Sequence, residues 1–340
     1  MIVVGGETLV DLVTREAPGV KDAGLPEVLA HLAPALGGGP FNVAIAAGRQ
    51  GAPVRFLTAM SRDLYGQAAR RALEGSGVGL ELIQDSGKPT SLAMALTGAD
   101  GAARYTFYVE GTADRAVEDP GPLPAETTLA CFGTLSLVLE PGASAYEAVM
   151  RREASRGTAV CLDPNIRAAL IEDPAAYRAR FESWLPELAL LKLSDDDASW
   201  LADGADPGEA ARGWAGRGPA AVVLTRGADG LEIYLAGREP IRIPGVSVTV
   251  ADTIGAGDTV MGTLVTRLHA LVDAHRSAHP ELTPREAAVR VTPEEWKEAA
   301  ERANVAAAIN TSRHGANPPT DAEISAYLAA APAIGDQTSG

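Results

Sequence analysis

The sequence predicts an α/β protein in which helices cover both faces of a mostly parallel central sheet. Short apolar runs typical of buried strands recur along the chain, and amphipathic helical patterns separate most of them. Of the 340 residues, 46% are hydrophobic and 21% are charged, which is typical of a globular protein rather than a disordered one. Length and composition together favour one main fold with room for a smaller appendage.

Six apolar runs predict the strands of the central sheet: residues 2–4, 54–58, 129–132, 159–162, 189–193 and 221–225. Apolar positions at three- and four-residue spacing predict helices over 42–49, 64–74, 144–155, 175–184 and 195–201. Residues 293–313 predict one or two Ala-rich helices, whereas 273–291 carry charge and Pro without a clear period and predict an exposed connection. This alternation predicts three layers in the order helix, sheet, helix.

One region departs from the alternation. The runs TSLAMALT and ARYTFYVE are strand-like, and residues 98–101 between them contain an Asp-Gly step that favours a hairpin. They predict a small second sheet over about 88–115, to which the Pro- and Gly-containing stretch 10–36 could add strands. The alternative is a hairpin at the edge of the main sheet.

Charge and cysteine usage exclude several classes of function. Acidic residues outnumber basic ones by 44 to 29, and the formal charge of -15 argues against a general binder of nucleic acid or anionic membranes. No run reaches about 18 consecutive apolar residues, and the N-terminus lacks a basic region before its apolar stretch. Cys131 and Cys161 lie in apolar runs, which suits reduced thiols and predicts a cytoplasmic location.

The segment DTIGAGD at 252–258 is the most informative for chemistry. It follows the strand-like run VSVTV and precedes an amphipathic pattern over 259–271 that predicts a helix. Glycines at such a junction let the backbone approach a ligand, and the first helical N–H groups attract negative charge. Asp258 could take a proton from a hydroxyl beside that anion site. The alternative is an ordinary turn in which Asp258 merely favours the helix N-terminus.

Two other glycine-rich segments are ambiguous alone. GGGPFN at 37–42 precedes a predicted helix and could contact a polyol, or it could be a plain turn with Asn42 as helix cap. TRGADG at 225–230 lies between strand-like runs, so it could be a hairpin turn or a loop against nucleotide phosphates.

Taken together, GGGPFN, DPN, TRGADG, DTIGAGD and SRHGA occur in an order and spacing that resembles the PfkB (ribokinase-like) carbohydrate kinases. The resemblance covers essentially the whole chain and implies one ribokinase-like domain over 1–340. In that family a three-layer αβα body carries ATP and a small β-sheet lid closes over the sugar, which here would be formed from about 10–36 and 88–115. A nicotinamide-dependent oxidoreductase is disfavoured, because GGETLVD after the first strand is no GxGxxG fingerprint.

The resemblance also implies roles for individual residues. Asp258 resembles the catalytic base, and the backbone of Gly255, Ala256 and Gly257 resembles the anion hole. The expected sugar contacts are Asp11, Gly38, Gly39, Asn42, Phe107 and Arg167. The expected nucleotide contacts are Lys192, Thr225, Gly227, Gly230 and Asn304.

The expected cofactors are ATP and Mg²⁺, and K⁺ is a further candidate. Two departures from the family pattern bear on the metals. Ile254 stands where Thr is frequent, and Ser194-Asp195-Asp196-Asp197 replaces the family's N-x-x-E motif near Mg²⁺. Asp197 is the candidate for orienting Mg²⁺, and Asp252, with the region of Gly315, is the candidate for a monovalent cation.

The resemblance is greatest to bacterial fructokinases, which implies phosphoryl transfer to the primary hydroxyl of D-fructose, giving fructose 6-phosphate. One alternative is a kinase for 2-keto-3-deoxygluconate, whose carboxylate would need Arg104, Arg115 or Arg167. The other alternative, from a different class, is a non-catalytic relative that binds sugar and regulates a partner, which the presence of Asp258 disfavours. The expected partner is a small sugar, with no nucleic acid and no membrane, and the lid could pair two subunits in a homodimer.

Overall fold

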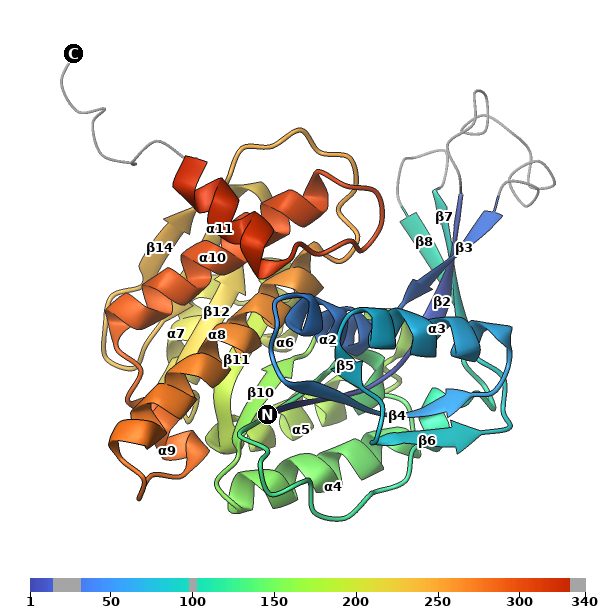
Figure 1. Ribbon diagram of the computed structural model, residues 1–340, viewed down its shortest axis with the longest axis horizontal. Helices are drawn as coiled ribbons and strands as arrows, with labels where there is room; N and C mark the ends of the chain where they lie inside the picture. The colour runs from blue at the N-terminus through green and yellow to red at the C-terminus, as the bar shows by residue number, and fades with distance from the viewer. Residues whose placement is uncertain (15–31, 98–102, 331–340) are drawn as a thin grey trace.

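The computed structural model describes residues 1–14, 32–97 and 103–330, and in this part of the chain it confirms the three-layer αβα fold (Figure 1). The ten-stranded central sheet has the order β14-β13-β12-β11-β10-β9-β1-β4-β5, with β6 paired to β4. Among the described strands of this sheet, the pairs β12–β13 and β13–β14 are antiparallel, and all the other pairs are parallel. The strands are β1 (Ile2–Gly5), β4 (Val54–Ser61), β5 (Val78–Gly79), β6 (Ile83–Ser86), β9 (Leu129–Gly133), β10 (Ala159–Asp163), β11 (Leu188–Ser194), β12 (Ala221–Thr225), β13 (Gly230–Tyr234) and β14 (Ile241–Pro244).

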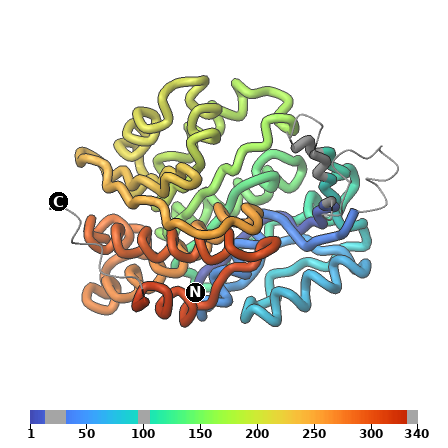
Figure 2. Tube along the Cα trace, turned by 90° about the horizontal axis from the view of Figure 1, so that it is seen from above, coloured from blue at the N-terminus to red at the C-terminus, as the bar shows by residue number. Residues whose placement is uncertain are grey.

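Helices cover both faces of this sheet, and seen from above they form two layers with the strands between them (Figure 2). On one face lie α2 (Gly39–Arg49), α3 (Leu64–Gly75), α8 (Ala256–Ala278), α9 (Pro284–Val289) and α10 (Pro293–Thr311). On the other lie α4 (Gly142–Ser155), α5 (Pro174–Trp184), α6 (Asp195–Leu201) and α7 (Pro207–Ala215). Within the described ranges, the remaining helical segments are α11 (Asp321–Ala330), η2 (Asp114–Ala116), η3 (Thr134–Leu137), η4 (Ala168–Leu170), η5 (Leu185–Glu187) and η6 (Gly227–Asp229).

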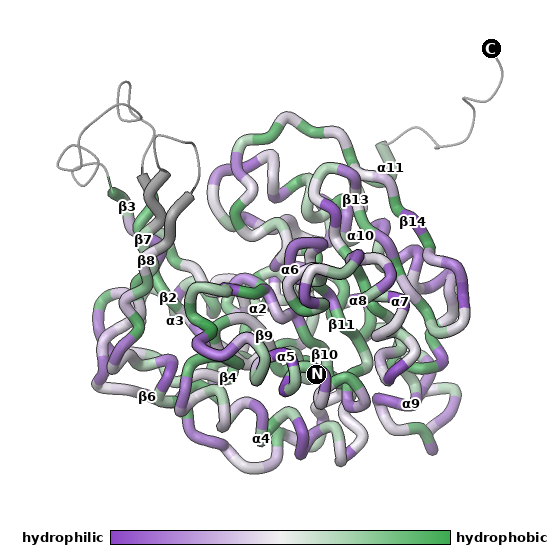
Figure 3. The backbone as a smooth tube through the Cα atoms, turned by 180° about the vertical axis from the view of Figure 1, so that it is seen from behind, coloured by the Kyte–Doolittle hydropathy of each residue, from purple (hydrophilic) through white to green (hydrophobic). Residues whose placement is uncertain are grey.

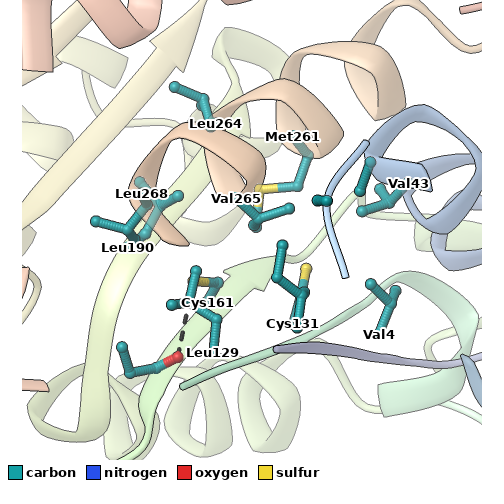
Figure 4. Close-up of a cluster of buried hydrophobic side chains, with 14 of the residues drawn as sticks. Val4, Val43, Leu129, Cys131, Cys161, Leu190, Met261, Leu264, Val265 and Leu268 are labelled. Atoms are coloured by element: carbon teal, nitrogen blue, oxygen red, sulfur yellow. Dashed lines mark hydrogen bonds between the residues drawn. The ribbon is translucent and has the colours of Figure 1, made fainter. Parts of the chain in front are cut away.

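The strands of the sheet alternate their side chains between two apolar cores. Val4 and Cys131 point to the core under α8 and α2, whereas Val3 and Phe132 point to the core under α4 and α5. In Figure 4, Met261, Leu264, Val265 and Leu268 of α8 pack against the strands, with both cysteines among them. Figure 3 shows the same central strands as mostly hydrophobic stretches of tube. This core fixes where α8 begins, and therefore where its N-terminus meets the ends of the strands.

A second sheet of four strands stands apart from the body, as predicted (Figure 1). Its order is β3 (Leu32–Gly37), β2 (Leu9–Thr14), β7 (Ser91–Thr97) and β8 (Ala103–Tyr108). The alternative of an edge hairpin on the main sheet is therefore wrong. The turn predicted at 98–101 and much of the stretch 10–36 lie outside the described residues.

Two local predictions are wrong. The supposed exposed connection over 273–291 contains the last turn of α8 and the whole of α9, because Thr283 and Glu286 form a capping box that starts a helix. Ala287 and Ala288 of that helix are fully buried against the sheet. The strand-like run VSVTV at 246–250 is not a strand, since β14 has already ended at Pro244. Its alternating residues pair with no strand in the part of the chain that the structure describes, and Val250 is exposed.

None of the helices in the described ranges is long and apolar enough to cross a membrane.

Candidate active site

A cleft of about 690 Å³ opens between the second sheet and the carboxyl ends of the parallel strands. The second sheet contributes Leu9, Asp11, Val13 and Phe107 to its lining. Short segments that follow β1, β9, β10, β11 and β12 supply most of the other lining residues, together with the start of α8. The carboxyl ends of strands in an open α/β sheet are where ligands bind in this class of fold.

The N-terminus of α8 forms one end of the cleft. Gly255 has φ 74°, a left-handed conformation that a glycine adopts without strain, and a Cβ there would lie 2.7 Å from the Cβ of Ala316. In the described part of the chain no side chain caps this helix, and Gly255, Ala256 and Gly257 all line the cleft. Uncapped N–H groups and the helix dipole make this end suitable for an anion.

Asp258 lies in the first turn of α8, with only 8% of its surface exposed. Its Oδ2 accepts a hydrogen bond of 2.8 Å from Nδ2 of Asn42, which belongs to α2. Burial raises the pKa of Asp258, while the Asn42 hydrogen bond and the positive charges of Lys192 and Arg167 act in the opposite direction. A carboxylate held in this way, beside an anion site, can accept a proton from a hydroxyl group.

Beneath the anion site lies a buried ion pair. Lys192 of β11 donates to Oδ2 of Asp163 at 2.8 Å, and both side chains are about 95% buried. The Nζ atom of Lys192 would be 3.0 Å from a Cβ on Gly257. Asp163 raises the pKa of Lys192 although burial opposes this, so the lysine carries its charge where the anion site opens.

All six expected sugar contacts border the cleft: Asp11, Gly38, Gly39, Asn42, Phe107 and Arg167. Burial, followed by the charge of Asp258, raises the pKa of Asp11 to about 6. A Cβ on Gly37 would lie 2.1 Å from the Asp11 carboxylate, so the glycine at 37 gives that side chain its space. Arg167 donates to Oδ1 of Asn165 at 2.6 Å, and both residues border the cleft.

The expected nucleotide contacts divide into two groups. Lys192, Thr225 and Gly227 line the cleft. Gly230 and Asn304 do not line it: the left-handed Gly230 packs against the backbone of β14, where a Cβ would lie 2.1 Å from the carbonyl oxygen of Ile243. Asn304 donates to the carbonyl oxygen of Pro244 at 2.8 Å. TRGADG is therefore both a hairpin connection, with β12 and β13 antiparallel, and a border of the cleft.

The candidate metal residues have well-defined protein partners. The Asp197 carboxylate accepts the N–H groups of Ile166 at 2.8 Å and Ser194 at 3.1 Å, and it also borders the cleft. The Asp252 carboxylate accepts the N–H groups of Ile254 at 3.0 Å and Gly315 at 2.9 Å, which ties the DTIGAGD segment to the loop after α10. Among the residues that the structure describes, no cluster of three or more His, Cys, Asp or Glu side chains is arranged to hold a metal.

Sequence reasoning did not single out two buried acids at the site, Glu7 and Asp163. Glu7 lies just past β1, borders the cleft, and receives hydrogen bonds from Gly39, Thr134 and Ser136. Asp163 is the counter-ion of Lys192. Glu7 lies two residues after the apolar strand β1, and Asp163 is the last residue of the otherwise apolar strand β10. An acidic residue at the carboxyl end of an apolar strand was the signal for both, because that position brings a carboxylate to the ligand-binding edge of the sheet.

A family model and curated relatives match most of the chain. The family model described as pfkB family carbohydrate kinase matches residues 1–323. A fructokinase from Rhizobium leguminosarum bv. trifolii is 35% identical over 261 residues, which cover 76% of this chain and 77% of that protein. Fructokinase-1 of Zea mays is 30% identical over 332 residues, covering 95% of this chain and 96% of that protein.

Two solved structures show the same fold. A fructokinase from Xylella fastidiosa with bound ATP superposes with a TM-score of 0.80 and 22% identity, covering 96% of this chain and 98% of that one. A fructokinase double mutant from Vibrio cholerae O395, bound to fructose, ADP and potassium, gives a TM-score of 0.79 and 22% identity, covering 96% and 97%.

Proposed function

The chain belongs to the pfkB family of carbohydrate kinases, and from that premise we propose that it transfers the γ-phosphoryl group of ATP to the primary hydroxyl of D-fructose. As a member of this family it is a phosphotransferase with an alcohol group as acceptor. The observation that carries the proposal is the placement of the Asp258 carboxylate, buried beside Asn42 at the uncapped N-terminus of α8. The two curated relatives described above are named fructokinases, and these names point to fructose and hence to fructose 6-phosphate as product.

In the proposed mechanism Asp258 is the base. The acceptor hydroxyl donates a hydrogen bond to the carboxylate and loses its proton as its oxygen attacks the γ-phosphorus, while the bond to the β-phosphate oxygen breaks. The backbone of Gly255, Ala256 and Gly257 receives the negative charge of the phosphoryl group, and Lys192 supplies a fixed positive charge beneath them. The Asp163 partner keeps this lysine protonated in its buried position.

On the sugar side, Asp11 and Asn42 offer a carboxylate and an amide to the hydroxyl groups, and Gly38 and Gly39 let the sugar approach the backbone. Phe107 and Arg167 are the proposed contacts at the mouth of the cleft. For the keto-acid alternative, Arg167 is a cation that borders the cleft, whereas Arg115 pairs with Glu110 at 2.6 Å. The side chain of Arg104 lies outside the described residues.

On the nucleotide side we propose that Thr225, Gly227 and Gly230 shape the loop over the ATP phosphates and that Asn304 lies beside the adenine. Mg²⁺ would neutralise charge on the phosphates, and it commonly takes one or two carboxylates with its remaining ligands from phosphate and water. The site fits that pattern, because the Asp197 carboxylate borders the cleft. Asp252, with the Gly315 loop, is the proposed neighbour of a K⁺ ion.

The whole chain is proposed to act as a single domain with the second sheet as its lid. Closure of that sheet would exclude water, which otherwise competes as phosphoryl acceptor. A homodimer formed through the lid is part of the same proposal. The two free, buried cysteines support a cytoplasmic location.

The test is release of ADP from Mg-ATP with separate acceptors: fructose, 2-keto-3-deoxygluconate, ribose, adenosine, tagatose and fructose 6-phosphate. We expect fructose to give the highest kcat/KM. Turnover on the keto acid alone would keep the kinase and discard fructose. Sugar binding without turnover on any acceptor would favour the non-catalytic regulator.

A further inference from the structure

Glu7 is a buried carboxylate at the edge of the sugar side of the cleft. It follows β1, has 3% of its surface exposed, and borders the cleft within reach of the loop that carries Gly38 and Gly39. A buried carboxylate without enough hydrogen-bond donors would be strongly destabilising. The donors around Glu7 therefore show which segments it holds in place.

Four donors from two separate segments converge on Glu7. Its Oε1 accepts the N–H group of Gly39 at 3.2 Å and a short hydrogen bond from the hydroxyl of Thr134. Its Oε2 accepts the N–H group of Ser136 at 3.2 Å and a short hydrogen bond from the Ser136 hydroxyl. The carboxylate therefore ties the first residue of α2 to the segment that follows β9.

These two segments pack tightly against each other at the loop of Gly38 and Gly39. Thr134 has φ 59°, an unfavourable conformation for a residue that is not glycine, and its Cγ2 would lie 2.5 Å from a Cβ on Gly39. Gly38, with φ 109°, lies against the backbone carbonyl of Glu7, where a Cβ would come within 2.7 Å. One turn further along α2, Asn42 donates to Asp258. The position of this loop relative to the base therefore depends on Glu7.

We propose that Glu7 is a positioning residue that holds Gly39 and Thr134 in place for the sugar, and that it does so as a carboxylate. This inference rests on the proposed sugar kinase activity and deepens it. Both N–H groups that Glu7 accepts can only donate, so an amide at this position would turn an NH₂ group toward a donor. Asp258 itself belongs to α8 and interacts with the positive charge of Lys192. We therefore expect a change at Glu7 to affect sugar binding more than it affects the chemical step.

The charge state of Glu7 gives a second readout. Burial raises its pKa to about 7, against the lowering effect of its Ser136 and Thr134 hydrogen bonds. The titratable groups facing it are Asp114, whose charge opposes ionisation of Glu7, and Tyr146, which stays protonated because burial raises its pKa. Asp11, across the loop, has a pKa of about 6. Affinity for the sugar should therefore fall as the pH is lowered through about 7, and fall again near 6.

The experiment compares Glu7→Gln with the wild type, using whichever sugar the wild type phosphorylates. We expect KM for the sugar to rise about 10- to 100-fold, because a buried donor is left unpaired, while KM for ATP and kcat at saturating sugar change far less. The step in sugar KM near pH 7 should disappear, and the step near pH 6 should remain. The KM values of Glu7→Gln are divided by those of the wild type on the same sugar. The inference is therefore tested separately from the proposal that fructose is the substrate.

The matched control is Glu153→Gln. Glu153 is also buried, at 2% exposure, and also accepts a backbone N–H group and a hydroxyl, from Leu123 and Thr158, but it borders no part of the cleft. This variant should lose stability with an unchanged sugar KM. An unchanged sugar KM in Glu7→Gln, or equal changes in both variants, would overturn the inference.

Ser136→Ala keeps the inference testable if Glu7→Gln does not fold. Ser136 does not border the cleft, and its hydroxyl donates to Glu7. We expect a smaller rise in sugar KM with the same pH signature moved upward, because a hydrogen bond that lowers the pKa of Glu7 is lost. A sugar KM equal to that of the wild type at every pH would contradict the proposal.

Discussion

The two sides of the cleft are built from different materials. The proposed sugar side contains buried polar side chains that form hydrogen bonds with one another, as in the contact of Asn42 with Asp258. On the proposed nucleotide side, the loop at 225–230 contributes glycine backbone, with Gly227 in open space and Gly230 against the backbone of β14. A site made of interlocked side chains is sensitive to single-atom changes and to pH, whereas a site made of backbone responds mainly to changes of chain conformation.

The largest effect should come from the base that both sides share. Asp258→Asn keeps the shape and the neighbour Asn42 but cannot accept a proton, so kcat should fall about 10²- to 10⁴-fold. Calorimetric titration with fructose should show the affinity within a few-fold of the wild type. A kcat near the wild-type value would mean that another group removes the proton.

The buried ion pair of Lys192 and Asp163 lies between the two sides of the cleft and is the next target. Lys192→Met leaves Asp163 buried without its counter-ion, which should lower the free energy of unfolding by about 3–5 kcal/mol in denaturant melts at pH 8. The loss should shrink at pH 5, where Asp163, whose pKa burial already raises to about 6, takes up a proton. The double variant with Asp163→Asn should recover part of the loss, and no recovery would argue against the pair as its cause.

A pair of glycine substitutions compares the two sides directly. In Gly39→Ala the added Cβ would lie 2.5 Å from Cγ2 of Thr134, which Glu7 holds, so KM for the sugar should rise about tenfold or more. In Gly227→Ala, at φ 54°, the Cβ meets nothing within 4 Å, and the cost should be about 1 kcal/mol of stability with KM for ATP little changed. Equal effects on the two KM values would break the comparison.

The smallest expected effect concerns Asp11. Its pKa of about 6 in the folded protein lies above the 3.8 of an ordinary aspartate, so between these values the unfolded chain holds fewer protons. The free energy of unfolding therefore falls as the pH rises through this window. Asp11→Asn should be about 1 kcal/mol more stable than the wild type at pH 8, equal to it near pH 4, and weaker in sugar binding. Equal stability at pH 8, measured by denaturant melts, would contradict this account.

The body of the fold was predictable because its signals are local. Short continuous apolar runs such as 159–162 are typical of strands buried on both faces, and this one is a strand. The helix α6 begins and ends where the sequence pattern predicts. The run VSVTV has the alternation of a strand but forms none. A strand needs a neighbouring strand to pair with, and the local sequence does not show whether one is present. The capping box at Thr283 was visible in the sequence and predicts the helix α9 that was missed.

The site was predictable to the extent that backbone motifs define it. Asp258 and Gly255 were singled out because glycines directly before a helix are a local pattern with a physical meaning. Glu7 and Asp163 were not, because their partners, Gly39, Thr134 and Lys192, are distant in the chain. The hydrogen bonds that make a buried carboxylate functional exist only after the strands have been placed side by side.

The most direct test of the central claim is ³¹P NMR of the products formed from Mg-ATP with fructose as the sole acceptor. We expect ADP and fructose 6-phosphate to accumulate in equal amounts. ADP with inorganic phosphate and no sugar phosphate, or phosphate on another hydroxyl of fructose, would contradict it.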